Sequence, residues 1–118
     1  MAIHVHEINE NTLEDLRATF FADNVKLVKK DCLSVRNIEN HIGTLKRYCD
    51  SWHLLYMPSK KCFRFTDKVA LVPLFCDDNM FIVHEGEVIS TSQHQHVYTG
   101  QDVGIVNTGS YSLTLVGK

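Results

Sequence analysis

The sequence predicts an α+β domain in which two N-terminal helices pack on a mainly antiparallel sheet of five to seven strands. Three observations support this fold class. Apolar residues recur every three or four positions in the first half of the chain, as on one face of a helix. From Trp52 onward they fall in short runs between turn residues, as in strands. These turns are too short for crossover connections, so antiparallel neighbours are expected, in a sheet that can curl into a partial barrel.

The first helix is expected over residues 11–22. Thr12 followed by Asp15 resembles a capping box, in which the first side chain caps the N-terminus of the helix. Three apolar residues then share one face at helical spacing: Leu13, Leu16 and Phe20. A short strand is expected to follow over residues 25–29.

The second helix is expected over residues 34–49, with Ser34 as its N-cap. Polar and basic residues occupy most of its surface, and Arg36 and Arg47 are expected to lie on the same side. One apolar stripe, which is expected to pack on the core, recurs at steps of three or four: Val35, Ile38, Ile42, Leu45 and Cys49.

Seven runs in the second half have the pattern of strands: residues 52–57, 62–66, 69–76, 80–84, 87–91, 103–107 and 111–116. The first two are expected to pair as a hairpin, as are the last two around Thr108 and Gly109. Glu85-Gly86 predicts a two-residue hairpin turn. Pro73 lacks an amide hydrogen, so its strand is expected at a sheet edge or with a bulge. One face of the last strand is expected to point inward: Tyr111, Leu113 and Leu115.

Length and composition predict one domain, residues 1–118, because 44% hydrophobic residues are enough for one modest core. No apolar run is long enough to span a membrane, and the chain does not begin with a secretory signal. We therefore expect a cytoplasmic protein with no membrane association. The cysteines are not closely paired, so we expect reduced and mostly buried thiols: Cys32, Cys49, Cys62 and Cys76.

Charge is distributed unevenly along the chain, although the formal net charge is only −2. Residues 26–68 contain ten of the twelve basic residues and carry a net charge of +6. The segments on either side, residues 1–25 and 69–118, carry −4 each. The basic segment also contains aromatic residues, and rings beside basic groups are what phosphate contact and base stacking require.

This segment predicts a small non-enzymatic binding or regulatory module that engages an anionic partner, either nucleic acid, a nucleotide or an acidic protein surface. The residues expected to bind this partner are Lys29, Lys30, Arg36, Lys46, Arg47, Lys60, Lys61 and Arg64. No catalytic residue and no cofactor is predicted, because the sequence lacks a Gly-x-Ser-x-Gly motif, a phosphate-binding glycine loop and a His-Glu-x-x-His motif.

An alternative function is indicated by two His-x-His pairs: His4/His6 and His94/His96. Residues i and i+2 of a strand share a face, so either pair could bind a divalent transition metal, with Glu7 or Asp102 adding a carboxylate. The segment from Gly86 to Gly104 resembles the cupin pattern of a glycine, His-x-His, a carboxylate and a closing glycine. The resemblance implies a small metal-binding β-barrel protein or enzyme. Its spacing departs from that pattern, because the first glycine lies too far from the pair and no Glu follows it in place.

A third function stays open beside these two. An exposed sheet edge could serve a protein–protein interaction or a structural subunit. The sequence also allows a homo-oligomer. Stoichiometric metal in the purified protein would favour the second function over the first.

Overall fold

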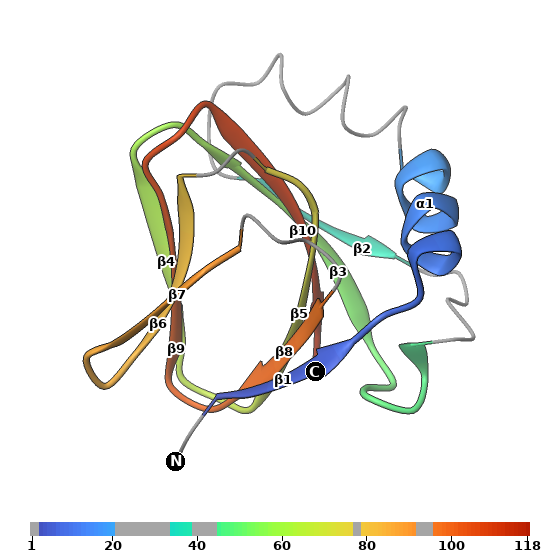
Figure 1. The fold of residues 1–118 in the computed structure, drawn as a ribbon, viewed down its shortest axis with the longest axis horizontal. Coiled ribbons are helices and arrows are strands. Elements are labelled where there is room, and N and C mark those ends of the chain that lie inside the picture. Colours follow the sequence, from blue (N-terminus) through green and yellow to red (C-terminus); the bar gives the residue numbers. More distant parts are fainter. Residues whose placement is uncertain (1–2, 21–33, 39–44, 77–78, 92–95) are drawn as a thin grey trace.

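The computed structural model describes residues 3–20, 34–38, 45–76, 79–91 and 96–118, with the backbone alone for 34–38. Within these residues the chain forms one helix and ten strands (Figure 1). In chain order they are β1 (His4–Glu7), α1 (Glu10–Thr19), β2 (Ser34–Ile38), β3 (Trp52–Pro58), β4 (Lys61–Phe65), β5 (Val69–Phe75), β6 (Met80–His84), β7 (Glu87–Ser90), β8 (His96–Gly100), β9 (Val103–Asn107) and β10 (Tyr111–Gly117). In this described part, no helix has the length and apolar character needed to cross a membrane.

The strands form two antiparallel sheets. One has the order β1-β8-β5-β10-β3-β2 and the other the order β4-β9-β6-β7. From β3 to β10 the chain changes sheet at every connection except the one from β6 to β7. This is the connectivity of a jelly roll, in which two sheets pack face to face. Figure 1 shows the sheets facing each other, and no strand pairing joins them among the described residues, so they do not form a closed barrel.

The central strands of the six-stranded sheet are buried on both faces. One face packs against the four-stranded sheet and the other against α1, which lies outside the sandwich (Figure 1). Strand β10 shows this alternation, because Val116 belongs to the core between the sheets whereas Leu113 and Leu115 belong to the core beneath the helix. The sequence predicted a single inward face for this strand, which is wrong because Ser112–Gly117 are all buried.

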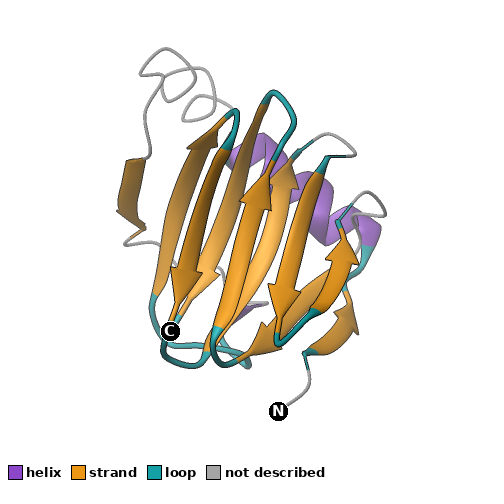
Figure 2. Cartoon of the chain, turned by 90° about the vertical axis from the view of Figure 1, so that its left-hand side faces the viewer, coloured by secondary structure: helices purple, strands orange, loops and turns teal. Residues whose placement is uncertain are grey.

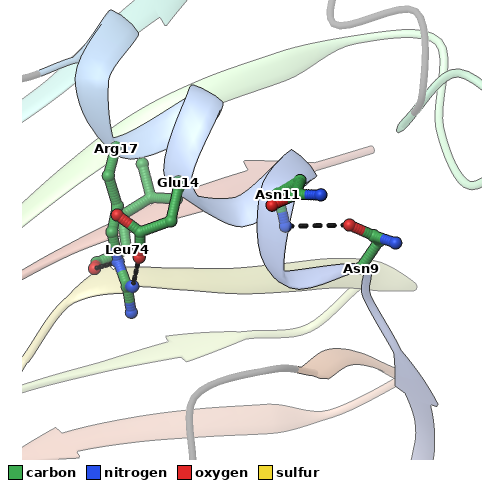
Figure 3. Close-up of polar contacts among 5 residues, drawn as sticks. All are labelled: Asn9, Asn11, Glu14, Arg17 and Leu74. Carbon is green, nitrogen blue, oxygen red and sulfur yellow. Dashed lines mark hydrogen bonds and ion pairs between the residues drawn. The ribbon is translucent and has the colours of Figure 1, made fainter.

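Helix α1 confirms the first predicted helix, but it begins earlier than expected. Asn9, not Thr12, is the N-cap, and its side-chain oxygen accepts a hydrogen bond from the backbone N–H of Asn11 at 2.8 Å (Figure 3). The cap therefore satisfies a donor that the first helical turn leaves without a partner. The predicted apolar face is buried as expected: Leu13, Leu16 and Phe20.

Arg17 fastens α1 to the sheet. Its Nε donates a hydrogen bond to the carbonyl oxygen of Leu74 on β5 at 2.8 Å, and its Nη1 donates to Glu14 Oε1 at 2.5 Å (Figure 3). The guanidinium is thus shared between a carboxylate one turn away on the helix and the backbone of a central strand. This arrangement sets the position of the helix along the sheet.

The second predicted helix is wrong, and with it the expectation of two N-terminal helices on five to seven strands. Ser34–Ile38 form the edge strand β2, which pairs with β3 so that Val35 lies opposite Leu55. Helical spacing of apolar residues was a local signal, and the backbone partners supplied by β3 overrode it. Residues 39–44 and the predicted strand over 25–29 lie outside the described residues.

Two of the three predicted hairpins are also wrong. Strand β4 pairs with β9 instead of β3, and β9 and β10 belong to different sheets. Their short turns cross from one sheet to the other, which sequence pattern alone does not distinguish from a hairpin. The hairpin at Glu85-Gly86 is confirmed by the pairing of β6 with β7, and both turn residues have positive φ (46° and 82°). Two-residue hairpins of type I′ require this conformation.

Pro73 lies in a central strand, because β5 is flanked by β8 and β10. The expected bulge is confirmed, since the register of β5 against β10 shifts between Leu113 and Thr114. The edge position is wrong. Pairing with β8 covers only Val69–Leu71, so Pro73 lies beyond the stretch where that neighbour needs amide donors.

Candidate partner-binding surface

The turn before β3 carries two exposed basic residues of the predicted segment, Lys46 and Arg47. Leu45 is buried (1% exposed) and its carbonyl accepts a hydrogen bond from the Tyr48 N–H at 3.0 Å. The indole Nε1 of Trp52 then donates to the carbonyl of Cys49 at 3.1 Å. Gly117 allows this packing, because a Cβ there would lie 2.9 Å from the Cys49 sulfur. The turn is therefore anchored at both ends while its middle stays in solvent.

Arg47, in the middle of this turn, lies against an aromatic ring. Its guanidinium carbon is 4.8 Å from the ring centroid of Tyr48, and its Nη2 donates to the Tyr48 hydroxyl at 2.7 Å. The ring of His6, on β1, lies 5.5 Å from the Tyr48 ring at 51°. The residues His6, Lys46, Arg47 and Tyr48 are called the Arg47 surface below; all but the half-buried Tyr48 are exposed.

Arg47 differs from two other arginines with described side chains in its ion pairing. Arg17 is paired with Glu14, and Arg64 is paired with Asp102 at 3.2 Å. Arg47 has no carboxylate partner among the residues that the structure describes. Its remaining N–H donors can therefore meet an external anion without first breaking an ion pair.

The pKa of the Cys49 thiol, at the end of this turn, is shifted by burial and by nearby charges. Burial raises the pKa of Cys49, and the negative charge of Asp50 acts in the same direction. A hydrogen bond with the Ala70 backbone and the positive charge of Lys68 oppose the rise in this pKa.

Three of the other predicted binding residues have described side chains, and these lie away from Arg47. Lys60 lies in the turn between β3 and β4, and Lys61 is the first residue of β4, so both lie beyond the end of β3 opposite to Trp52. Arg64 lies on β4, in the other sheet. Arg36 lies on β2, where only its backbone is described, and Lys29 and Lys30 lie outside the described residues. Among the residues described with side chains, the structure thus places Lys46 and Arg47 in one turn and Lys60, Lys61 and Arg64 in other regions.

The histidines do not form a metal centre within the described part of the chain. His6 lies opposite Val97 and shares a sheet face with it, whereas His96 lies opposite Glu7, on the other face. This separates the two halves of the predicted ligand set, and His94 lies outside the described residues. Among the described residues no three His, Cys, Asp or Glu side chains are grouped so that they could hold a metal ion.

The cysteines in the described ranges are free thiols. Cys49 and Cys76 are half-buried, but Cys62 on β4 is exposed, so the expectation of burial is wrong for this residue. Its strand has one face toward solvent, and Cys62 lies on that face. Cys32 lies outside the described residues.

A groove of about 470 Å³ lies on the four-stranded sheet, where Arg64, His84, Asp102 and Gly104 are among its lining residues. The buried His84 is held there by a 3.1 Å hydrogen bond between its Nδ1 and the carbonyl of Asp102. Sequence analysis missed this groove, because its residues come from three strands that are adjacent only in the folded sheet.

A comparison with protein-family models finds no match, and neither does a search of curated proteins.

The chemistry available at the Arg47 surface therefore follows from its side chains alone. Arg47 and Lys46 offer N–H donors and positive charge, while Tyr48 and His6 offer aromatic rings. Such a combination binds anionic groups that are attached to planar ones, since the cations hold the charge and the rings contact the planar part. Sequence analysis identified Lys46 and Arg47 but missed His6 as their neighbour, because no local spacing links β1 to this turn.

Proposed function

We propose that the protein is a small binding module that engages a single-stranded nucleic acid or nucleotide through the Arg47 surface. The observation that carries this proposal is Arg47 itself, whose guanidinium lies against Tyr48 and has no carboxylate partner among the described residues. A guanidinium held in this way has lost part of its rotamer freedom before binding, so a phosphate contact costs less entropy.

The neighbouring side chains favour a nucleotide over an acidic protein surface. Lys46 is exposed beside Arg47 and adds a second phosphate contact. The tilted rings of His6 and Tyr48 lie within 5.5 Å of each other and supply aromatic surface for a base. An acidic protein surface would need cations but no rings. The proposal therefore names a phosphate-bearing, base-containing ligand, and binding to an acidic peptide alone would contradict it.

The test is a titration of fluorescently labelled single-stranded oligonucleotides at two salt concentrations. Wild type should bind more weakly at the higher salt, because phosphate contacts release counterions. Arg47→Glu should weaken binding by about tenfold or more, since charged contacts contribute about 1.5–3 kcal/mol each. The matched control is Lys61→Glu, the same reversal at an exposed lysine at the other end of β3.

Three outcomes decide the proposal. Loss with Arg47→Glu and little change with Lys61→Glu would support it. Equal loss in both variants would mean that binding follows net charge only and would contradict the assigned surface. Absence of binding by wild type to oligonucleotides and to nucleoside phosphates would contradict the function.

A further inference from the structure

The outer face of the four-stranded sheet has an apolar composition that is unusual for a face turned to water. Strand register places its outward residues in two rows: Arg64, Gly104, Val83 and Val88 in one, and Cys62, Val106, Phe81 and Ser90 in the other. Arg64 is the one charged residue of these eight. Antiparallel sheets with one solvated face normally present polar residues on that face.

No described element covers this outer face, as Figure 2 shows for the sheet nearest the viewer, with α1 behind it. Val88 is 62% exposed, and Phe81, Val83 and Val106 are half-buried although they point outward. The corresponding apolar face of the six-stranded sheet is covered by α1. The two outer faces are therefore alike in chemistry, but only one has its cover within the described chain.

The middle of the outer face is hollowed at Gly104. Gly104 has no side chain, and the side chain of Val83 on β6 lies close beside it: a Cβ at Gly104 would be 2.9 Å from Cγ2 of Val83, closer than such atoms approach in proteins. The groove of about 470 Å³ lies over this glycine. A hollow on one strand and a valine on the next make the row asymmetric across the sheet.

We propose that a second copy of this chain packs face to face on the outer face, with a two-fold axis that runs along the strands between β9 and β6. Such an axis reverses the strand order, so that β9 of one copy lies over β6 of the other. The hollow at Gly104 then faces Val83 of the second copy, and Phe81 faces Val106. The axis is compatible with the small angle at which aligned sheets pack.

The charges at the border of the face are complementary under the same axis. Arg64 lies on β4 at one side, and Glu85 lies in the β6–β7 turn at the other side, where both border the groove. The axis places Arg64 of one copy near Glu85 of the other, twice per dimer. The contact of Arg64 with Asp102 involves side chains that are 72% and 50% exposed, so it holds the guanidinium weakly and leaves it within reach of the second copy.

The size of the face predicts weak association. Four strands at about 4.8 Å spacing and four to five residues in length give a face of about 19 by 15 Å. Two such faces bury about 600 Å² in total, which is below the roughly 1,200 Å² of stable interfaces, so association is expected to be transient and to depend on concentration. The dimer is thus expected to form at high but not at low protein concentration.

Sedimentation velocity over an about 100-fold range of concentration tests the proposal. Wild type should shift from monomer to dimer, whereas Val88→Asp and Val106→Lys should stay monomeric over most of the range. The Val106 variant distinguishes association through the outer face from association through a sheet edge. Strand β9 is central in its sheet, so a charge on it does not block pairing at an edge. The matched control is Val5→Asp, the same change at the 48% exposed valine of β1.

A charge exchange tests the orientation of the two copies. Arg64→Glu and Glu85→Lys should each raise the dimer dissociation constant several-fold, and the double variant should recover most of that loss. Thermal unfolding of every variant confirms that it is folded. The proposal would be overturned by a wild type that stays monomeric at all concentrations, by association that survives Val106→Lys, or by a double variant as weak as the sum of its single changes.

Discussion

The ring of His6 lies 5.5 Å from the ring of Tyr48 at an interplanar angle of 51°, and this contact joins β1 to the turn that carries Arg47. His6 is itself positioned by β8, because β1 pairs with β8 and His6 Nε2 lies 3.2 Å from Thr99 Oγ1. The Arg47 surface thus depends on the pairing of an edge strand. Its geometry is a property of the assembled sheet, and changes to any of these side chains can be tested separately.

Two substitutions at Tyr48 should distinguish the contribution of its ring to oligonucleotide affinity from that of its hydroxyl. Tyr48→Phe removes only the acceptor of the 2.7 Å hydrogen bond from Arg47, so oligonucleotide affinity should fall by about two- to fivefold. Tyr48→Ala also removes the ring beneath the guanidinium and should weaken binding by about tenfold or more. Titration at one fixed salt concentration measures both. Affinity unchanged in Tyr48→Ala would show that the ring does not position Arg47.

The N-cap of α1 should be at Asn9. Asn9→Ala removes the acceptor of the Asn11 N–H hydrogen bond and should lower the free energy of unfolding by about 1 kcal/mol. Thr12→Ala is the control, because Thr12 lies inside the helix, and it should change stability by less than about 0.5 kcal/mol. Urea denaturation of the two variants measures the difference. A larger loss with Thr12→Ala would restore the capping box that the sequence predicted.

Stability should decrease at alkaline pH. Burial raises the pKa of Cys49 above its ordinary value of 9.0 and the pKa of Tyr98 above 10.0, in the latter case with a smaller effect from Cys76. Both groups stay neutral over a wider pH range in the folded protein than in the unfolded chain. Their contribution to the free energy of unfolding is therefore complete below the ordinary pKa values, and it is lost as pH rises through the pKa values of the folded protein.

The measurement is the free energy of unfolding from neutral pH to about pH 11, where both ordinary pKa values have been passed. The free energy should stay level first and then fall. Cys49→Ala should remove the part of the fall that begins first, and Tyr98→Phe the later part. A profile of Cys49→Ala parallel to that of wild type would show that this thiol has the same pKa in both states.

Local sequence signals determined several elements of the fold. The turn at Glu85-Gly86 was predictable because two residues with positive φ in sequence specify one hairpin type. The buried face of α1 was predictable from the spacing of Leu13 and Leu16, since i, i+3 periodicity depends only on helix geometry. Alternation and turn residues predicted seven of the eight described strands from Trp52 onward, but they missed β8 (His96–Gly100).

The sequence by itself determined where many strands lie and where positive charge is concentrated, because these depend on neighbouring residues. Only the tertiary structure decided which sheet each strand joins, and it turned residues 34–38 into an edge strand through pairing with β3. It also separated Arg47 from Lys61 and brought His6 to Tyr48. The physical reason is that backbone hydrogen bonds and side-chain packing between distant segments select the strand partners, and no local periodicity contains that information.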